Sequence, residues 1–288
     1  MENLRDLRRR RRSVINTQQI TRAMKMVSAA KLRRSQDVLF GARPYATSLT
    51  NLLLDVLQRE APDIHPLLTP RNGGRAALIA IAGDRGLSGA FNGNVFKQTE
   101  HYLAERHGQQ IELTMCGRKS LEYFRRRGIK IDRLIEGVEK KLNFEYARDM
   151  IEPFLKRFQE KEVDRVVVIY TQFHSALRQE LRVRTLLPVL DGERPERKPS
   201  DFRPLYEPSA AAVLSSLIPQ YLFSQFYLML LESQASENGA RMTAMDNATN
   251  NAAELISQLT LQLNRARQAA ITTEIMEIVS GAEALKNR

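Results

Sequence analysis

The chain contains a single cysteine, Cys116, and no tryptophan among its 288 residues. One cysteine excludes an internal disulfide and argues against redox chemistry within the chain. Cys116 lies in an apolar run, so we expect it to be a small buried residue. No apolar run approaches the length of about 18 residues that a membrane span requires, and the first residues lead into charge rather than into an apolar signal segment. We therefore expect a soluble or peripheral protein that is not exported.

Acidic residues are absent from a long basic stretch near the N-terminus. Between Arg8 and Arg34 there are ten basic residues and no Asp or Glu, in a chain whose net charge is +11. The basic residues are Arg8 to Arg12, Arg22, Lys25, Lys31, Arg33 and Arg34. Such a stripe is a solvated face, a nucleic-acid binder or a dock for an acidic protein. Helices that bind nucleic acid usually interleave aromatic residues, and none occurs between Met1 and Val38.

The motifs of common enzyme classes are also missing. The loop from Gly83 to Gly89 follows a predicted strand, where a phosphate cradle would lie, but its glycines are three residues apart and no Gly-Lys-Ser/Thr follows. We interpret this loop as a tight turn between a strand and a helix. No two of the four histidines share a helical face with a carboxylate, and neither Ser88 nor Ser175 has a GxSxG context. The sequence thus predicts no catalytic residue, no metal site and no cofactor.

What the sequence does contain is a long heptad repeat, from Leu214 to Ala270. Counting alternately three and four residues forward gives a seam in which only Ser224, Asn238 and Thr249 are polar. The seam consists of Leu214, Leu217, Tyr221, Ser224, Leu228, Leu231, Ala235, Asn238, Met242, Met245, Thr249, Ala252, Ile256, Leu259, Leu263, Ala266 and Ala270. A repeat held over about eight heptads favours a left-handed coiled coil, which needs a partner helix, over a core helix of an all-α bundle. At a rise of about 1.5 Å per residue this arm would be about 85 Å long.

The first part of the chain is the predicted partner helix. From about Asn3 to Leu57 strong helix formers dominate, and Ile20, Met24 and Val27 fall at helical spacing. Pro44 cannot donate a backbone hydrogen bond, so we expect a kink or a break just before it. Two long helices at opposite ends of one chain would form an intramolecular antiparallel coiled coil.

Between the two arms, strands alternate with helices. Short, wholly apolar runs predict strands buried on both faces at Ala76–Ala82, Ile111–Cys116 and Val163–Tyr170. Helices are expected around Val95–Arg106, Lys119–Arg127 and Phe144–Gln159. This order indicates βαβ units and a mostly parallel sheet. An alternation of Leu181, Val183, Thr185 and Leu187 with charged or polar neighbours predicts a last strand at an edge, with one wet face.

The predicted fold class is therefore α/β: a long antiparallel two-helix coiled coil from the N- and C-terminal helices, plus a Rossmann-like α/β domain with a mostly parallel sheet. We expect a coiled-coil helix over residues 1–60, a loop over 61–74, the globular domain over 75–190, a proline-rich linker over 191–208 and the second coiled-coil helix over 209–288. Five prolines from Pro188 to Pro208 make the return to the arm stiff. Pro219 either bends the last helix or moves its start.

Polar side chains gather near the end of the last helix. They are Asn264, Arg265, Arg267, Gln268, Thr272, Thr273 and Glu274. In most proteins such a cluster is a solvated helix face. Here the stretch is poor in Lys and Glu, rich in Ala and Ile, and at the tip of a projecting arm, so contact with another protein is an equally good interpretation.

Both ends of the chain resemble one known family. The run SVINTQQITRAMKMVSAAKLRRSQ from Ser13 to Gln36 and the run from Ser236 to Leu285 look like the two ends of the gamma subunit of F-type ATP synthases. The sequence GDRGLSGAFN, from Gly83 to Asn92, is similar to that family's loop after the first strand, and Gly117-Arg118-Lys119 fits its later turn. Ser88 stands where many members carry a cysteine, so the thiol switch of the plant-plastid type should be absent.

The resemblance implies a non-catalytic rotor subunit with no enzyme activity of its own. In that family the terminal helices form a shaft inside a hexamer of alternating alpha and beta subunits, and the α/β domain lies beside the membrane ion-driven ring, the c-ring, and the epsilon subunit. Rotation of the ring cycles the catalytic sites on the beta subunits. One copy per complex, no nucleic-acid partner and a peripheral location on the cytoplasmic side of a bacterial inner membrane are implied too.

The resemblance also assigns contact residues. Met24 and Lys25 would face a beta subunit, and loops of the hexamer would meet Arg241, Arg267, Gln268, Thr272 and Glu274. Tyr206 and Glu207 would lie at the foot, near the membrane ring and the epsilon subunit. Two alternatives come from the residues alone. One is a nucleotide-dependent α/β protein centred on the loop from Gly83 to Gly89, and the other is a basic coiled coil that docks on nucleic acid with a steep salt dependence.

Overall fold

The computed structural model describes the chain except for residues 1–3, 58–64, 72, 191–206, 208 and 287–288. It has two compact units: the helical unit, residues 1–27 with 242–288, and the sheet unit, residues 28–241. Two long helices, α1 (Leu4–Leu57) and α6 (Ala210–Lys286), contribute residues to both units. The predicted linker lies outside the described residues except for Glu207.

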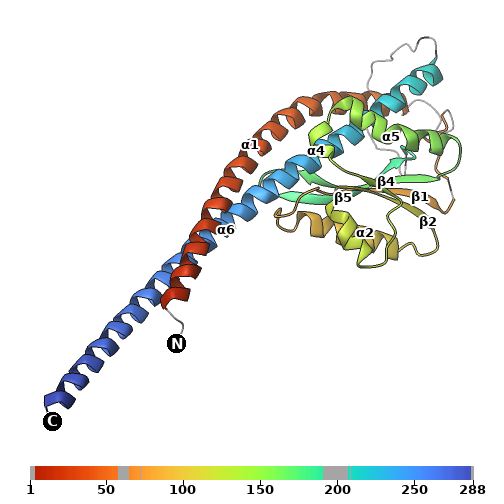
Figure 1. Ribbon diagram of the computed structural model, residues 1–288. Helices are drawn as coiled ribbons and strands as arrows, with labels where there is room; N and C mark the ends of the chain where they lie inside the picture. Colours follow the sequence, from red (N-terminus) through yellow and green to blue (C-terminus); the bar gives the residue numbers. More distant parts are fainter. Residues whose placement is uncertain (1–3, 58–64, 72, 191–206, 208, 287–288) are drawn as a thin grey trace. The chain divides into compact units, whose positions relative to one another are not determined.

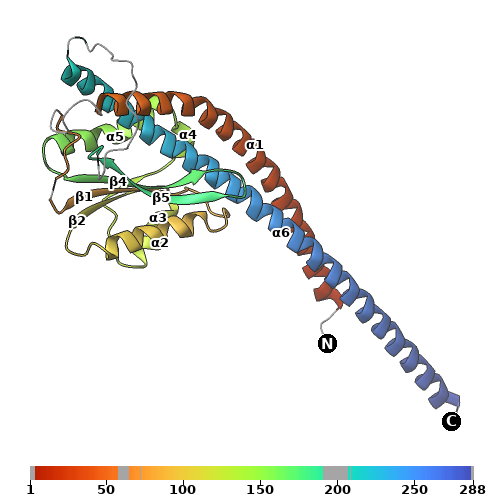
Figure 2. The ribbon, with the colours of Figure 1, turned by 180° about the vertical axis from the view of Figure 1, so that it is seen from behind.

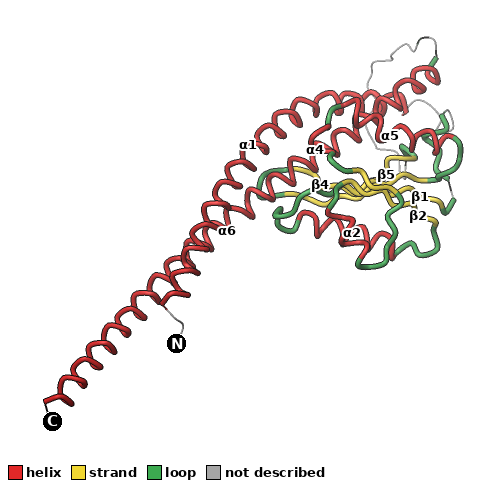
Figure 3. Tube along the Cα trace, viewed as in Figure 1, coloured by secondary structure: helices red, strands yellow, loops and turns green. Residues whose placement is uncertain are grey.

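The sheet unit is built on five strands. They are β1 (Arg75–Ile81), β2 (Gln110–Cys116), β3 (Arg133–Ile135), β4 (Arg165–Phe173) and β5 (Gln179–Leu187). Their order in the sheet is β3-β2-β1-β4-β5. The strands are drawn in yellow in Figure 3. The first four strands in this order run parallel, and β5 is antiparallel to β4. Every residue of β1 after Arg75 is buried, as expected for a strand that helices cover on both faces.

Helices cover both faces of this sheet (Figures 1 and 2). They are α2 (Phe91–Ala104), α3 (Lys119–Arg125), α4 (Val138–Lys141) and α5 (Phe144–Gln159), together with the parts of α1 and α6 in this unit. Leu78 of β1 belongs to a core with Phe96 of α2 on one face. Its neighbour Ile79 belongs to the opposite core, with Phe154 of α5 and Phe226 of α6. Adjacent residues of one strand thus serve two apolar layers.

Most predicted elements of this unit are confirmed, with ends displaced by a few residues. The helix predicted at Phe144–Gln159 coincides with α5, whereas α2 begins earlier than predicted, at Phe91. Strand β3 and helix α4 were not predicted from the sequence. They are 3 and 4 residues long, which is too short for apolar periodicity to register.

Strand β5 lies at the edge of the sheet, as predicted, but its predicted alternation is wrong at the centre. Val183 is 42% exposed. The neighbouring Arg184 is half-buried and donates to the side chains of Gln225 (2.9 Å) and Tyr221 (3.2 Å) on α6. The helix that covers this strand offers polar acceptors, so a guanidinium with a long apolar stem fits there better than a valine.

Within the sheet unit, α1 and α6 run antiparallel. Cross-helix hydrogen bonds join Asn238 to Ser35 (3.5 Å), Arg43 to Glu232 (3.1 Å) and Gln225 to Thr50 (3.1 Å). On α1, buried apolar residues recur every seven positions, at Leu32, Leu39, Ala46 and Leu53. A seven-residue recurrence is the pattern of a helix that packs along a partner.

Neither proline interrupts its helix. Helix α1 continues through Pro44 to Leu57, so of the kink or break expected there, the break does not occur. Helix α6 begins at Ala210, so Pro219 does not move its start. A proline inside a helix costs about 3 kcal/mol, which packing of the flanking turns against other elements can offset.

In the helical unit, the first turns of α1 pair antiparallel with α6 (Figure 1). The Arg11 guanidinium donates to the Thr260 hydroxyl at 3.0 Å, and the Lys25 ammonium donates to the Asp246 carboxylate at 2.6 Å. The predicted seam of α6 is confirmed where it faces α1. Its members Met245, Ala252 and Leu259 are all less than a tenth exposed.

The α1 side of this pair differs from the prediction. Ile20 is 60% exposed and Val27 58% exposed, and Met24 is half-buried. The buried positions of α1 in this unit are instead Leu7 and Thr21, two heptads apart. A small side chain such as Thr21 lets the two backbones approach, whereas the larger apolar residues project outward.

The end of α6 extends beyond the end of α1. Since Arg11 lies opposite Thr260, Leu4 lies opposite Arg267, seven residues further along in each direction. The later turns of α6 have no partner helix among the described residues of this unit. Ile271 and Ile278 are accordingly 48% and 68% exposed.

Helix α6 is also long and apolar enough, by length and composition, to cross a membrane, contrary to the expectation that no apolar run is long enough. However, 61% of its most apolar 18-residue window is buried inside the protein. Packing against the sheet and α1 accounts for that apolar character.

Candidate functional site

Met24 and Lys25 lie on α1 in the helical unit, beside α6. Both are half-buried, and the Lys25 ammonium lies 2.6 Å from the Asp246 carboxylate. The side chains of this ion pair are 41% and 43% exposed. A pair this open to water stabilises a protein by about 0–1 kcal/mol, so it orients Lys25 on the surface more than it holds the helices together.

Four predicted contact residues lie on the unpaired end of α6, which we count from Arg267, opposite the first described residue of α1, Leu4. They are Arg267, Gln268, Thr272 and Glu274, and all are exposed. The Thr272 hydroxyl donates to the Gln268 carbonyl at 3.0 Å. Exposed apolar residues, Ile275 and Met276 among them, surround this polar group. A mixed polar and apolar surface that no described residue of the chain covers is typical of a protein-contact surface.

Arg241, also a predicted contact residue, is buried within the sheet unit at 8% exposure. Its guanidinium forms an ion pair with Glu237, one turn earlier on α6, and donates to the carbonyl of Gly86 at 3.3 Å. Burial raises the pKa of Glu237, and Arg241 opposes that shift. The guanidinium is therefore occupied by partners in its own chain, and it holds the loop after β1 against α6.

Helix α6 occupies the crevice where an α/β sheet of this topology usually binds a ligand. That crevice lies at the carboxyl ends of β1 and β4, because the strand order reverses between them. A Cβ placed on Gly83, after β1, would lie 2.5 Å from the Glu237 carboxylate. Gly239 of α6 lies against the turn after β4, where a Cβ on it would be 3.4 Å from the Cα of Ala176. A dinucleotide therefore has no room at the switch point.

Two serines fix α6 to the same end of β4. The Ser233 hydroxyl accepts from the backbone N–H of Thr171 at 3.2 Å, and the Ser236 hydroxyl donates to the Thr171 carbonyl at 3.2 Å. Both serines are 2% exposed or less. With the Arg241 contact, these bonds join α6 rigidly to the sheet.

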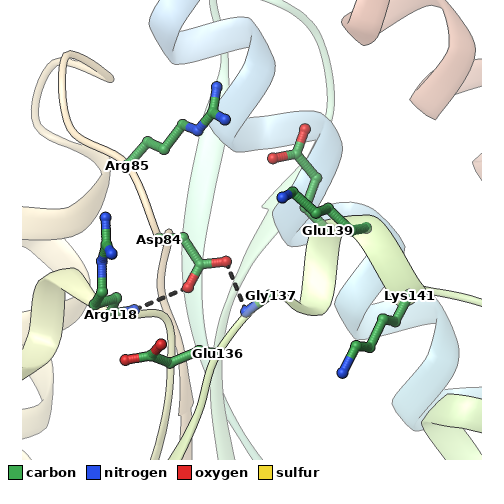
Figure 4. Close-up of a pocket in the computed structure, with 8 residues that line it drawn as sticks. Asp84, Arg85, Arg118, Glu136, Gly137, Glu139 and Lys141 are labelled. Atoms are coloured by element: carbon green, nitrogen blue, oxygen red, sulfur yellow. Dashed lines mark hydrogen bonds between the residues drawn. The ribbon is translucent and has the colours of Figure 1, made fainter.

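The loop from Gly83 to Gly89 is held by side chains rather than shaped as a phosphate cradle. Asn92 accepts from the N–H of Gly83 at 2.8 Å and donates to the carbonyl of Arg85 at 3.0 Å. The Asp84 carboxylate accepts from the N–H groups of Arg118 (3.0 Å) and Gly137 (2.9 Å), as Figure 4 shows. Asp84 thereby joins the loops that follow β1, β2 and β3. The connection is a loop from Ala82 to Ala90 rather than the tight turn that we expected, and these side-chain hydrogen bonds hold it in place.

The foot residues predicted from the family are only partly described. Glu207 is exposed, at a bend before α6, and Tyr206 lies outside the described residues. Among the residues that the structure describes, no three His, Cys, Asp or Glu side chains gather as a metal site would require.

Sequence reasoning did not identify Asp84, Asn92 or Glu237 as important. Asp84 and Asn92 lie within the GDRGLSGAFN motif, so that motif was a usable signal for a braced loop. Glu237 carried no signal, because an acidic residue on a helix normally faces water.

The chain matches the family model described as ATP synthase over residues 3–285. It is 47% identical over 289 residues to the ATP synthase gamma chain of Solibacter usitatus, with 99% of each chain covered. It is 44% identical over 293 residues to the ATP synthase gamma chain of Chlorobium phaeobacteroides, again with 99% of each covered.

Two solved structures share the fold. One is a chain of the Euglena gracilis mitochondrial ATP synthase, from a structure of OSCP, F1 and c-ring, with a TM-score of 0.71 at 19% identity, covering 98% of this chain and 94% of that one. The other is a chain of the Tetrahymena thermophila mitochondrial ATP synthase, from a structure of the central stalk and c-ring. Its TM-score is 0.59 at 23% identity, with 80% of this chain and 99% of that one covered.

Proposed function

The chain belongs to the ATP synthase gamma chain family, and on that premise we propose that it is the rotor shaft of a bacterial ATP synthase, turning inside a hexamer of alpha and beta subunits. It is a central-stalk subunit without catalytic chemistry of its own. It couples rotation of a membrane ion-driven ring to conformational cycling of the catalytic sites. The alternatives, a nucleotide-binding α/β protein and a coiled coil that docks on nucleic acid, have no support in this family.

The observation that carries the proposal is the helix pair of the helical unit. Arg11, Thr21 and Lys25 of α1 each contact α6, and α6 then continues alone, with its surface exposed. Because the α1–α6 helix pair presents different side chains on its different sides, it would contact three otherwise equal catalytic subunits differently. Because each contact favours one conformation of its neighbour, the angle of the shaft determines which site is open and which is closed.

The sheet unit receives the torque in this proposal. The c-ring and an epsilon subunit would bind at the foot, near Tyr206 and Glu207. Bonds from Ser233, Ser236 and Arg241 couple the sheet to α6, which is unbroken from Ala210 to Lys286. Torque on the sheet would therefore pass along a continuous helix. One copy per complex and a peripheral location on the cytoplasmic side of the inner membrane complete the proposal.

We assign the contacts with the hexamer to Met24 and Lys25 on the helix pair, and to Arg267, Gln268, Thr272 and Glu274 on the unpaired end of α6. Exposure of the last four, and of the ion-paired Lys25, supports the assignment. We leave Arg241 out of this set, since its guanidinium is occupied within the sheet unit.

Co-expression with alpha and beta subunits tests the assembly. Native mass spectrometry of the purified complex should show one copy of this chain per hexamer, and the chain alone should not hydrolyse ATP. Exclusion from the hexamer, or ATP turnover by the free chain, would contradict the proposal.

Site-specific crosslinking tests the contacts. The only native cysteine, Cys116, is buried, so a thiol-reactive photo-crosslinker should label an introduced cysteine selectively. A crosslinker on Thr272→Cys should join this chain to alpha or beta. The matched variant is Leu177→Cys. Leu177 lies in a turn of the sheet unit and is 84% exposed, so a crosslinker there reports non-specific crosslinking. Equal crosslinking yields from the two positions would contradict the assignment of the α6 end as a contact with the hexamer.

Replacing Met24 with lysine tests the coupling role. We expect Met24→Lys to impair ion pumping driven by hydrolysis more than it impairs assembly, because a charge placed on the shaft surface alters its contact with beta. Leu177→Lys is the control for an added charge. Parallel loss of assembly and pumping would argue against a role in coupling.

A further inference from the structure

A pocket of about 380 Å³ opens at the carboxyl ends of three parallel strands in the sheet unit. Asp84 and Arg85 line it after β1, and Arg118 lines it after β2 (Figure 4). The lining residues after β3 are Glu136, Gly137, Glu139, Lys140 and Lys141. This volume falls in the range of about 300–1,000 Å³ that is typical of ligand sites. The carboxyl end of a parallel sheet is also where α/β folds bind ligands. The pocket is separate from the switch point that α6 fills.

Four cationic side chains line this pocket. They belong to Arg85, Arg118, Lys140 and Lys141. None of the four has an ion-pair or side-chain hydrogen-bond partner in the part of the chain that the structure describes. In Figure 4, Arg118 lies to one side of Asp84 and Lys141 to the other, and Arg85 lies above Asp84 with its guanidinium pointing away from that carboxylate. The cations therefore approach the pocket from two directions.

The three carboxylates of the pocket offset only part of this positive charge. Asp84 already accepts two backbone hydrogen bonds, and Glu139 is paired with Lys31 at 2.7 Å. Glu136 is the remaining carboxylate of the lining. Backbone N–H groups are neutral, so Asp84 keeps its negative charge. Four unpaired cations outnumber the two lining carboxylates without an ion-pair partner, Asp84 and Glu136, and the excess positive charge attracts an anion.

The shape and lining indicate the class of anion. Arginine forks bind phosphate oxygens in pairs, and lysine adds a mobile point charge. Cations on two sides suit a ligand that spans the pocket, as a chain of two or three phosphates does. The lining has no aromatic or large apolar side chain on which a base would stack. A ligand would therefore be held by its phosphates and not by a nucleobase.

We propose that this pocket binds a small oligophosphate through Arg85, Arg118, Lys140 and Lys141, without reading any base attached to it. The ligand class includes pyrophosphate, tripolyphosphate and the phosphate chain of nucleotides. The loop from Gly83 to Gly89 contributes the Arg85 side chain, and not a cradle of backbone N–H groups. This site does not depend on the rotor role, and either conclusion can fail alone.

Titration calorimetry on the full-length chain at low salt tests the proposal, with sodium tripolyphosphate as the probe. We expect saturable binding to the wild type and about tenfold weaker binding to the double variant Arg118→Gln/Lys141→Gln, a loss of about 1.4 kcal/mol. The matched control Lys97→Gln/Arg148→Gln removes the same charge from exposed positions on α2 and α5 and should bind like the wild type. Equal weakening in both double variants would mean a diffuse charge effect and would overturn the site.

Competing ligands test the chemistry. ATP and GTP should bind as tightly as tripolyphosphate, and inorganic phosphate should bind more weakly, because it spans only part of the pocket. A clear preference for ATP over GTP would refute the absence of base recognition. Citrate or a polyglutamate peptide that binds as tightly as tripolyphosphate would show a surface for carboxylates and would overturn the oligophosphate assignment.

Discussion

The hydroxyl of Thr249 on α6 lies 2.8 Å from the hydroxyl of Thr21 on α1 and donates to it. Thr21 in turn donates to the carbonyl of Gln18 on its own helix at 3.0 Å. At 8% exposure Thr21 is a polar residue inside a coiled-coil seam. Satisfied hydroxyls at this position allow close packing without an unpaired polar group.

Enlarging this position should separate the helices. We expect Thr21→Leu to destabilise the helical unit by about 1–3 kcal/mol through overpacking. The control Val27→Leu, at an exposed position of the same helix, should change stability by less than about 0.5 kcal/mol. Urea unfolding followed by circular dichroism measures both. A Thr21→Leu protein as stable as the wild type would show that the seam has spare room.

Gly117 provides a test of backbone geometry. Its φ is +102°, and an added Cβ would lie 2.5 Å from the carbonyl oxygen of Ala82. Gly117→Ala should therefore cost about 1–3 kcal/mol from its backbone conformation, and more from the clash. Gly128 has φ +68° and open space around it, so Gly128→Ala should cost only about 1 kcal/mol. Thermal unfolding should rank the two variants in this order, and the reverse order would contradict the packing around Gly117.

The buried pair of Glu237 and Arg241 should make stability depend on pH. Burial raises the pKa of Glu237 in the folded chain. A carboxyl group with a raised pKa contributes its full stability below its unfolded pKa of about 4.3, and loses it as the pH rises through the folded pKa. Glu237→Gln cannot titrate, so this decline should disappear from its urea midpoint measured across the same pH range. A pH profile identical to that of the wild type would exclude the effect.

Removing the other partner of this pair should be costlier. Arg241→Gln leaves a buried carboxylate without its cation, and we expect a loss of about 3–5 kcal/mol at neutral pH. The same change should raise the pKa of Glu237 further and extend the decline to higher pH. The double variant Glu237→Gln/Arg241→Gln carries no buried charge here, so it should be more stable than Arg241→Gln alone. If it is less stable, the charge of Glu237 is not the cause of the loss.

The thiol of Cys116 should be inert in the native chain. It is buried in β2, and burial raises its pKa to about 12. Thiolate is the reactive form, so a thiol reagent at neutral pH should label the native chain very slowly and the urea-unfolded chain readily. Rapid labelling of the native chain would indicate local opening of the sheet.

The strands could be predicted because a buried parallel strand is apolar without interruption, as Ala76–Ala82 is. The heptad seam of α6 was equally visible, since its apolar residues recur over many turns. The facing side of α1 was not. Its larger apolar residues, Ile20 and Val27, project away from α6, whereas Thr21 lies in the seam. A hydrophobic pattern reports that a face is to be buried, but not against which surface.

The contacts that hold the loop from Gly83 to Gly89 against α6 and the neighbouring loops could not be predicted, for a different reason. Glu237 and Arg241 are spaced one turn apart, which on most helices indicates an exposed ion pair. Only the fold brings the loop from Gly83 to Gly89 over them and excludes water. The same applies to Asp84, whose two backbone partners come from loops far along the chain.

The seating of α6 over the ends of β1 and β4 has a mechanical consequence. In an α/β domain that binds a ligand at this crevice, the walls of the crevice can move apart and together. Such a domain deforms at the crevice when torque is applied. Here the chain's own helix fills the gap, and Gly83 and Gly239 lie where the backbone and α6 pack closely. The contact between α6 and the sheet should therefore be stiff. Elastic deformation under load would be concentrated in the unpaired end of α6 rather than at the sheet.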